Sequence, residues 1–599
     1  MNEKKLFGHR KGISTTIIAV IVIIVILVVA GGLYFALTTS TTKTTTTSTP
    51  VTTTSQSLTT TTSSVVTVTP TTTSSFSNST ALSLTFANVP NSDPAIGSDE
   101  AGSAALVNLY DTLVFPTASG AVVPDLATSW TISSNSLTYT FTLRSGVTFH
   151  NGDTLTAEDV VFSMNRLLDM AQGYSYLFSP YVANITAPSS NTVVINLKST
   201  FGPFLSALVR LYVLDKAQVL AHEVTVSSGA EPNANGTDYG STWLLTHDAG
   251  SGPYYMVSAN LEANMVFGEY SNYWNSTNPN QPAYVQYYGT SATSTVEALF
   301  QSHQTVITDQ WQPYSIVQTL ASTKGAQMVE IPTVNEMYLM LNTAKAPTDD
   351  IYVREAMSYA LNYSAIINGA SAPFEGSQPS SGPVASVLPG HDSMIPKSTQ
   401  NLTLAMQIIK QSKYWNSATN SITGTVQYYW VTAVPAEQAL ALEFASDMQK
   451  IGITVNVVGV PWLSVVSDLG NESSSPNVVS IEDGASYFEA GSTLQSRYTL
   501  ASQGTWEQNE WMNNQTLNNA ILSALSIVNQ TQRFQAYDTL QQQIYNLYPS
   551  IYAFDVYEVR AYYPSVVNWY AANGHPIALL GYDFFWRNIQ FYPSALASL

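Results

Sequence analysis

The chain has 599 residues but no cysteine, and few of its residues are charged. Disulfide bonds and thiolate metal sites are therefore excluded, and a core alone has to hold the fold. Charged residues make up 10% of the chain, and 40 acidic residues outnumber 21 basic ones, for a net charge of -19. A nucleic acid partner is excluded, because neutralising phosphates requires clustered lysines and arginines.

Short motifs of common catalytic and nucleotide-binding sites are also missing. The chain contains no H-E-x-x-H, P-loop, G-x-G-x-x-G or G-x-S-x-G pattern, and its seven histidines are scattered. These absences predict a protein without catalytic residues, metal ligands or cofactors. A glycoside hydrolase stays open as an alternative, because that chemistry requires only two carboxylates about 5 to 9.5 Å apart.

The N-terminal 37 residues have the pattern of a membrane segment. Residues 1–12 carry basic side chains and precede an apolar run from Ile17 to Leu37, which is long enough to cross a bilayer. We expect a cytoplasmic or signal segment at 1–12 and a transmembrane anchor at 13–37, with the rest of the chain extracellular. Arg10–Ser14 resembles the archaeal prepilin-like signal, which is cleaved after the glycine, here Gly12. A cleaved secretory signal is the alternative.

Residues 38–81 form a low-complexity segment, in which serine or threonine occupies 32 of the 43 positions from 38 to 80. This composition buries too little apolar surface to offset the entropy lost on ordering, so we expect a flexible stalk. N-glycosylation sequons on the expected outer side predict a glycoprotein. They begin at Asn78, Asn184, Asn235, Asn275, Asn362, Asn401, Asn471, Asn514 and Asn529.

From residue 82 the sequence has the alternation of a globular α/β protein. Apolar residues alternate along 137–144 and 192–198, which predicts half-buried strands. The stretch 437–460 reads as an amphipathic helix, a cap at Gly452 and a strand, and 533–549 reads as a helix that ends before Pro549. Helices and strands without strict alternation indicate α/β lobes with mixed sheets.

A polar cluster around His150 has two interpretations, a metal or acid/base site and a scaffold. Asn151-Gly152 favours a turn, and Thr156 with the acidic residues after it has the form of a capping box. Apolar residues then follow at helical spacing from Val160 to Leu168. We therefore interpret the cluster as a turn, a helix cap and the first turn of a helix.

Several stretches, in order along the chain, resemble one family. They are NLYDTLVF (108–115), VVPDLATSWTIS (122–133), LTYTFTLRSGVTFHNGDTLTAEDVVFSMNRL (137–167), AGSGPYYM (249–256), MYLMLNTAKAPTDDIYVREAMSYALNYSAII (337–367) and MQKIGITVNV (448–457). They are similar to the peptide/nickel/oligosaccharide class (family 5, OppA/DppA-like) of extracytoplasmic solute-binding proteins of ABC importers. The resemblance covers nearly all of residues 82–599.

The resemblance implies a bilobal fold of the periplasmic-binding-protein type, with two lobes joined by a hinge. Residues 82–115, 250–335 and 555–599 would form lobe I, residues 116–249 an extra domain inserted in lobe I, and residues 336–554 lobe II. It implies a monomeric receptor that captures an oligopeptide or oligosaccharide by lobe closure and delivers it to ABC permease and ATPase subunits. A cell-surface glycoside hydrolase and a surface-layer or adhesion protein are the alternatives.

One departure from the family's sequence motif leaves the identity of the ligand open. Peptide binders of this class usually carry W-x-x-D-Y-x-[DE]-P, whose Asp pairs with the ligand's ammonium group. In the matching stretch, 483–490, Ser486 stands at the Asp position, and a shift of three residues would place Asp483 there. Oligosaccharides are thus as well supported as peptides, since sugars stack on aromatic rings and need no ammonium partner. The expected ligand-binding residues are Trp311, Asn342, Tyr429, Trp430, Trp462, Glu482, Asp483, Ser486 and Tyr487.

Overall fold

The computed structural model describes residues 80–226, 236–275, 278–368 and 374–599, which belong to one compact unit, residues 74–599. The expected anchor at 13–37, residues 38–79 of the expected stalk, and the sequons at Asn78 and Asn235 lie outside the described residues. Among the helices that are described, none has the length and apolarity required to span a membrane.

A four-stranded sheet begins the described unit, in the order β1-β10-β9-β8. Its first pair is parallel and the other pairs are antiparallel. Its inner side chains are large and aromatic: the rings of Phe267 and Tyr287 both pack on Trp586, from the C-terminal segment. The strands are β1 (Leu82–Phe86), β8 (Tyr254–Asn260), β9 (Asn264–Glu269) and β10 (Tyr284–Gly289).

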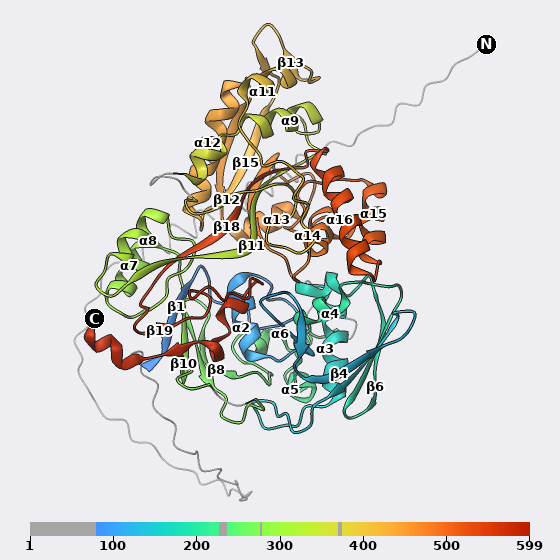
Figure 1. The fold of residues 1–599 in the computed structure, drawn as a ribbon, viewed down its shortest axis with the longest axis vertical. Helices are drawn as coiled ribbons and strands as arrows, with labels where there is room; N and C mark the ends of the chain where they lie inside the picture. Colours follow the sequence, from blue (N-terminus) through green and yellow to red (C-terminus); the bar gives the residue numbers. More distant parts are fainter. Residues whose placement is uncertain (1–79, 227–235, 276–277, 369–373) are drawn as a thin grey trace, which may run out of the picture. The chain divides into compact units, whose positions relative to one another are not determined.

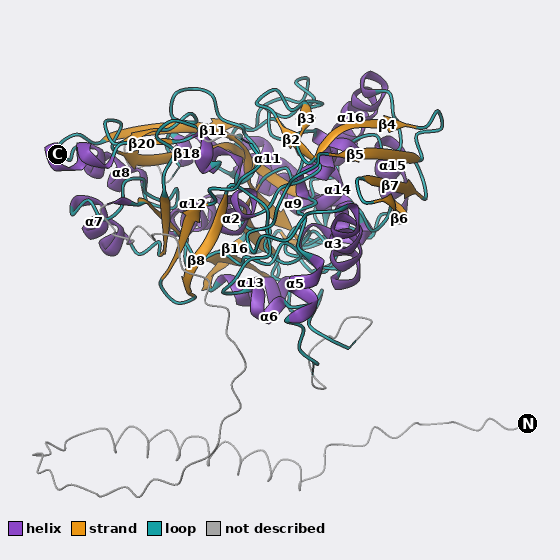
Figure 2. Ribbon diagram, turned by 90° about the horizontal axis from the view of Figure 1, so that it is seen from below, coloured by secondary structure: helices purple, strands orange, loops and turns teal. Residues whose placement is uncertain are grey.

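A second four-stranded sheet, β4-β5-β7-β6, is antiparallel throughout. Tyr139, Phe141 and Leu143 alternate into the core, as the period of two predicts. Helix α3 (Ala157–Met170) packs on β6 and β7 (Figure 2). The strands are β4 (Ala127–Ile132), β5 (Thr138–Leu143), β6 (Val182–Ser189) and β7 (Thr192–Leu197).

The cluster around His150 lies in the loop that leads into α3 and in the first turn of that helix. Thr156 is the N-cap residue, and the Asp159 carboxylate accepts from its backbone N–H at 2.8 Å and from its hydroxyl at 2.9 Å. The His150 ring contacts the Asp248 carboxylate through Nδ1 and the Gly252 carbonyl through Nε2, at 3.0 Å. These contacts brace the loop before α3, so the scaffold interpretation accounts for the cluster.

A six-stranded mixed sheet has the order β12-β18-β11-β17-β15-β16. Its side chains alternate between two cores: Met337 and Leu339 face one, and Tyr338 and Met340 face the other. Helix α12 (Pro435–Lys450) packs on β15 and β16. The strands are β11 (Gln327–Leu341), β12 (Gln378–Pro379), β15 (Thr425–Val431), β16 (Thr454–Val460), β17 (Val478–Asp483) and β18 (Ser550–Tyr562).

The long strands β11 and β18 lie side by side as the central antiparallel pair (Figure 1). Their register shifts between Pro332 and Glu336, where three residues of β11 stand opposite Val556. Thr333 bonds across this irregularity to the Val556 carbonyl at 2.8 Å. Beyond it, Ile307 bridges to Leu84 of β1 and to Tyr562 of β18, so the pair runs from the six-stranded sheet to the edge of the first sheet.

The remaining elements are helices around the sheets and short two-stranded ribbons. The ribbons are β2 (Val114–Pro116) with β3 (Val122–Pro124), β13 (Trp415–Asn416) with β14 (Ser421–Ile422), and β19 (Val567–Asn568) with β20 (Gln590–Phe591). The other α-helices are α2 (Glu100–Leu109), α4 (Phe204–Ala207), α5 (Lys216–Ala221), α6 (Ser241–Leu244), α7 (Thr293–Gln301), α8 (Tyr314–Ala321), α9 (Ile351–Ala360), α10 (Tyr363–Ile367), α11 (Leu402–Ile409), α13 (Trp462–Leu469), α14 (Ala490–Tyr498), α15 (Gln515–Leu525) and α16 (Gln530–Tyr545).

The elements predicted from periodicity are confirmed, with bounds shifted by a few residues. The strands at 137–144 and 192–198 are β5 and β7, and the helix, glycine and strand at 437–460 are α12, Gly452 and β16. Gly452 has a φ of 78°, the left-handed conformation that favours glycine after a helix. The helix expected before Pro549 is α16, which ends four residues earlier, at Tyr545.

Candidate functional site

Buried and half-buried carboxyl groups gather where β11 and β18 lose their register and where β17 ends. We call them the acidic group, and in the described chain the arginines among their electrostatic partners are Arg497 and Arg560. Charged residues are scarce in this chain, so their concentration here is a marked feature. The members of the acidic group are Glu100, Glu336, Glu482, Asp483, Glu507, Glu558 and Asp583.

Arg497 of α14 neutralises one part of the acidic group. Its Nη1 lies 2.5 Å from Glu336 and its Nε lies 3.2 Å from Asp483. The guanidinium also stacks on the ring of Tyr338, 3.8 Å from its centroid. Glu336 and Asp483 therefore already have a cation, which holds the middle of β11 and the end of β17 to α14.

Arg560 of β18 neutralises a second part. Its Nη2 lies 2.7 Å from Glu100, at the start of α2, and 2.9 Å from Glu558. Nearby, Glu558 and Asp583 line a small cavity of about 20 Å³, together with residues 331–335 and 576–581. The Oδ2 atom of Asp583 is buried and has no hydrogen-bond partner within the described residues.

Glu482 and Glu507 remain without a cation. Over the described parts of the chain, no basic nitrogen lies within 4 Å of either carboxylate. Glu482 accepts a hydrogen bond from Asn335 at 2.9 Å, in the irregular part of β11. Burial raises the pKa of both Glu482 and Glu507 to about 8. A positive group placed beside either carboxyl group would favour its charged form, because an opposite charge offsets the cost of burial.

Aromatic side chains lie next to the acidic group. Trp311, Tyr429, Trp462 and Trp506 pack against the core on one face of the six-stranded sheet. Trp462 and Trp506 meet edge to face, with ring centroids 5.4 Å apart. The same core contains Tyr338, on which Arg497 stacks, so the aromatic cluster and the acidic group share a border.

Two predicted ligand residues lie away from this border. Trp430 follows Tyr429 in β15 and therefore points to the opposite face, where it packs against the core beneath α9 and α12. Asn342 is fully buried at the end of β11, where its backbone N–H donates to Asn477 and its Oδ1 accepts from Ala344. Asn342 therefore belongs to the interior, and the half-buried Trp430 covers the core on the opposite face of the sheet.

Ser486 and Tyr487 lie in the segment between β17 and α14. This segment contacts Tyr176, which precedes β6, and Arg210, which precedes α5. The Ser486 hydroxyl is 2.8 Å from the Tyr176 hydroxyl, and its carbonyl accepts from Arg210 Nε at 2.8 Å. Tyr487 is fully buried, with its hydroxyl 3.4 Å from Gln495. The Tyr176 hydroxyl also interacts electrostatically with Glu507 and Asp483, so Ser486 lies beside the acidic group.

Sequence reasoning did not select Glu336, Arg497, Glu507 or Trp506. Glu336 and Arg497 are 161 positions apart, and only the fold brings them together. One signal was available: Glu336 directly precedes the apolar run 337–341 in a chain with few charges. A charged residue in that setting indicates a buried ion pair or a site.

The middle of the chain is similar to a known family. Residues 121–504 match the family described as bacterial extracellular solute-binding proteins, family 5 Middle. The probable D,D-dipeptide-binding periplasmic protein DdpA of Escherichia coli (strain K12) is 27% identical over 370 residues, covering 61% of this chain and 67% of that protein. The nickel-binding periplasmic protein of the same organism is 30% identical over 278 residues, covering 44% of this chain and 48% of that protein.

Solved structures show the same fold over most of the described chain. The ABC transporter-associated periplasmic binding protein DppA from Helicobacter pylori, in complex with the peptide STSA, has a TM-score of 0.72 and 21% sequence identity. The likeness covers 85% of this chain and 98% of that chain. The fold is therefore the mixed α/β fold of the periplasmic binding proteins.

Proposed function

Because the chain belongs to family 5 of the extracellular solute-binding proteins, we propose that it captures a peptide-like solute outside the cell. It then delivers the solute to the permease and ATPase subunits of an ABC importer. The chain is a solute-binding protein and not an enzyme. Its work is therefore binding, and the glycoside hydrolase alternative is set aside.

Capture proceeds by closure of two lobes about the β11–β18 pair. Three residues of β11 stand opposite one residue of β18 at the irregularity, and such a local loss of pairing is where strands bend. Contacts such as Tyr176 to Ser486, which join segments 310 positions apart, would form as the lobes meet. The lobes would be lobe I (82–115, 250–335, 555–599), with the extra domain (116–249), and lobe II (336–554). The boundaries between lobe I and lobe II fall within β11 and β18, at the irregularity of this pair.

The ligand carries a positive group, and the unpaired carboxylates of Glu482 and Glu507 are the observation that carries this proposal. Because burial raises the pKa of both groups to about 8, they are mostly protonated at neutral pH without a ligand. The ammonium group of a peptide would favour and pair with their charged forms, which a neutral oligosaccharide cannot do. One relative is named for binding a D,D-dipeptide, and another is named for binding nickel, a metal cation. Trp462 and Trp506 supply apolar surface for the rest of the ligand.

The chain is held at the membrane by its N-terminal segment, so that the binding unit stays near the permease. The apolar run from Ile17 to Leu37 and the Ser/Thr-rich stalk support this arrangement. The full-length chain is then expected in the membrane fraction of cells that produce it. Recovery of a mature chain without the apolar run from the culture medium would contradict anchoring.

A thermal-shift screen of the full chain in detergent micelles tests the ligand class. The probes are a library of free tripeptides with randomised side chains, and mixtures of malto- and cello-oligosaccharides. We expect the tripeptides to raise Tm, because a ligand that binds only the native state stabilises it by mass action. A rise with the oligosaccharides alone, or with neither probe, would overturn the proposal.

A further inference from the structure

A small cavity lies between the irregular part of β11 and the loop formed by residues 576–581. Its volume is about 20 Å³. The side chains of Asp583 and Glu558 belong to its lining, and most of the other lining side chains are apolar, among them Ile331 and Ile577. The cavity therefore combines apolar walls with two carboxyl groups.

The Asp583 carboxyl group has an oxygen that nothing in the described chain satisfies. Asp583 is 9% exposed, and its Oδ2 atom is buried without a hydrogen-bond partner among the described residues. Burial raises the pKa of Asp583 well above its ordinary value, and Glu558 raises it further. Arg560 and the backbone N–H groups of Asp583 and Phe584 oppose this rise. The group is thus a buried acceptor beside a cavity, and a cation there would favour its charged form.

Arg560 does not balance the carboxyl groups at this cavity. Its Nη2 lies 2.9 Å from Glu558 and 2.7 Å from Glu100, and its Nη1 donates to the Thr308 carbonyl at 2.8 Å. Two carboxylates therefore already share this guanidinium. Asp583 interacts with it electrostatically but forms no ion pair with a basic side chain of the described chain. One further positive charge would find carboxyl groups in place to compensate it.

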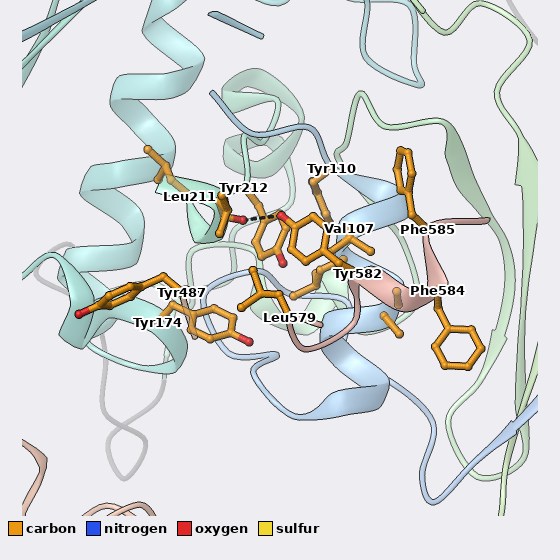
Figure 3. Packing of buried hydrophobic residues seen from close by; sticks show 14 of the residues in the cluster. Val107, Tyr110, Tyr174, Leu211, Tyr212, Tyr487, Leu579, Tyr582, Phe584 and Phe585 are labelled. Carbon is orange, nitrogen blue, oxygen red and sulfur yellow. Dashed lines mark hydrogen bonds between the residues drawn. The ribbon is translucent and has the colours of Figure 1, made fainter. Parts of the chain in front are cut away.

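The neighbours of Asp583 in the sequence fix its position. Tyr582 and Phe584 flank it, and both rings pack in the large core cluster (Figure 3). The Tyr582 hydroxyl donates to the Val209 carbonyl at 2.8 Å, and the Asp583 carbonyl accepts from Trp569 Nε1 at 2.8 Å. The backbone that carries the carboxyl group is therefore held on both sides, as a binding site requires.

Asn335 joins the cavity to the proposed ammonium site. It lines the cavity, and its side-chain amide donates to Glu482 at 2.9 Å. Burial raises the pKa of Glu482, and Glu558 at the cavity raises it further. A solute that binds beside Glu482 is therefore adjacent to the cavity, and a side chain of that solute has a place to enter.

We propose that the cavity is a subsite for the ammonium group of a lysine side chain, so that the captured solute is a lysine-containing peptide. The ammonium group would donate to Asp583 Oδ2 and to the Glu558 carboxylate, and the aliphatic stem would lie against the apolar walls. This inference rests on the proposed function, and it adds a requirement on a side chain of the solute.

The size of the cavity makes the subsite selective among cations. A volume of about 20 Å³ holds one water-sized group, and an ammonium group has that size. The planar guanidinium group of arginine is larger and carries its donors in a rigid fork. We therefore expect lysine to be preferred over arginine as well as over uncharged side chains of similar length.

Two other accounts of the cavity lead to different preferences. A buried water molecule would fill it without any preference among solute side chains. The net charge of -19 would attract lysine and arginine alike, because a long-range field does not distinguish the two cations. A preference for lysine over both norleucine and arginine therefore separates the subsite from these alternatives.

The experiment presents the full chain, in detergent micelles, with an equimolar mixture of alanine tripeptides in which each position in turn is replaced. The replacements are lysine, Nε-acetyllysine, norleucine and arginine. Retained peptides are quantified by mass spectrometry for the wild type, Asp583→Asn and Asp153→Asn. Asp153→Asn is the matched control, because it makes the same change at an exposed side chain. Asparagine is close in volume to protonated aspartic acid, so Asp583→Asn is expected to keep the fold.

For at least one position, the wild type and the control are expected to retain the lysine peptide over each of the other three by about tenfold, or about 1.4 kcal/mol. Asp583→Asn should reduce the ratio of lysine to norleucine to less than about twofold, while retention of the norleucine peptide changes little. A substitution that only loosens the structure would lower the retention of all four peptides by a similar factor and leave the ratio unchanged.

An unchanged ratio in Asp583→Asn would overturn the inference while peptide capture stands. Equal retention of lysine and norleucine peptides, or of lysine and arginine peptides, by the wild type would overturn it as well. These wild-type ratios decide the matter even if Asp583→Asn fails to fold. If the wild type retains no peptide in any form, the proposed function fails and the inference fails with it.

Discussion

At the scale of single residues, neighbouring side chains of one strand have different roles. Tyr429 packs on the aromatic cluster that borders the acidic group, and Trp430 packs on the opposite core. Likewise, Asp483 is paired with Arg497, while Glu482 beside it has no cation within 4 Å in the described chain. The side of the strand on which a residue lies, more than its type, decides whether it can reach a ligand.

Alanine substitution should therefore separate the tryptophans. Trp462→Ala is expected to weaken ligand affinity about tenfold or more, because its ring borders the site. Trp430→Ala should leave the affinity within about twofold and lower the unfolding free energy by roughly 2 kcal/mol, a part of the cost of removing a fully buried tryptophan. Isothermal titration and urea denaturation measure the two effects. Loss of binding in Trp430→Ala with unchanged stability would contradict the placement.

At the scale of elements, the loop before α3 is a brace, and its residues should affect stability alone. Thr156→Ala is expected to cost about 1 kcal/mol, the usual cost of losing an N-cap side chain. His150→Ala should cost more, about 3 kcal/mol, because it leaves the buried Asp248 carboxylate without its partner. Ligand affinity should change little in either variant. A large loss of affinity in His150→Ala without a loss of stability would favour a metal or acid/base role.

Local patterns predicted the elements better than they predicted the site. Alternation along 137–144 and the capping box at Thr156 are local, so β5 and α3 follow from the residues themselves. The acidic group depends on contacts across long sequence separations, such as Glu336 with Arg497, which only the strand order brings together. Periodicity also shows that Tyr429 and Trp430 face opposite sides, but it does not show which side faces a ligand.

The expected ligand-binding residues illustrate the same limit. Glu482 and Asp483 belong to the acidic group, and Trp311, Tyr429 and Trp462 border it. Ser486 and Tyr487 lie at the contact with Tyr176 and Gln495. A motif match alone gave no means to decide between Ser486 and Asp483, because a shift of three residues preserves most of the pattern.

At the scale of the whole molecule, buried acids make stability depend on pH. Burial raises the pKa of Glu336 to about 7 and those of Glu437, Glu482, Glu507 and Glu510 to about 8, from an ordinary value near 4.5. The native state thus holds protons that the unfolded chain has released, and unfolding releases them. This contribution is fully present below about pH 4 and is lost as the pH rises through 7 to 8.

The free energy of unfolding of the ligand-free chain should therefore fall as the pH rises from about 5 to 8. Urea denaturation at several pH values in that range measures it, with the salt concentration held constant. Acid denaturation should be weak for the same reason. A cooperative unfolding transition between pH 5 and pH 3 would contradict this expectation.

The most direct test of the account is whether the ligand's ammonium group binds beside Glu482 or Glu507. Isothermal titration would compare a retained tripeptide with its N-acetylated form, on the wild type and on the Glu482→Gln/Glu507→Gln double variant. Glu158→Gln/Glu472→Gln is the control, because both side chains are exposed. We expect acetylation to weaken binding about tenfold or more in the wild type and the control, and by less than about twofold in the double variant, since the interaction is then already lost. Equal weakening by acetylation in all three proteins would contradict the account.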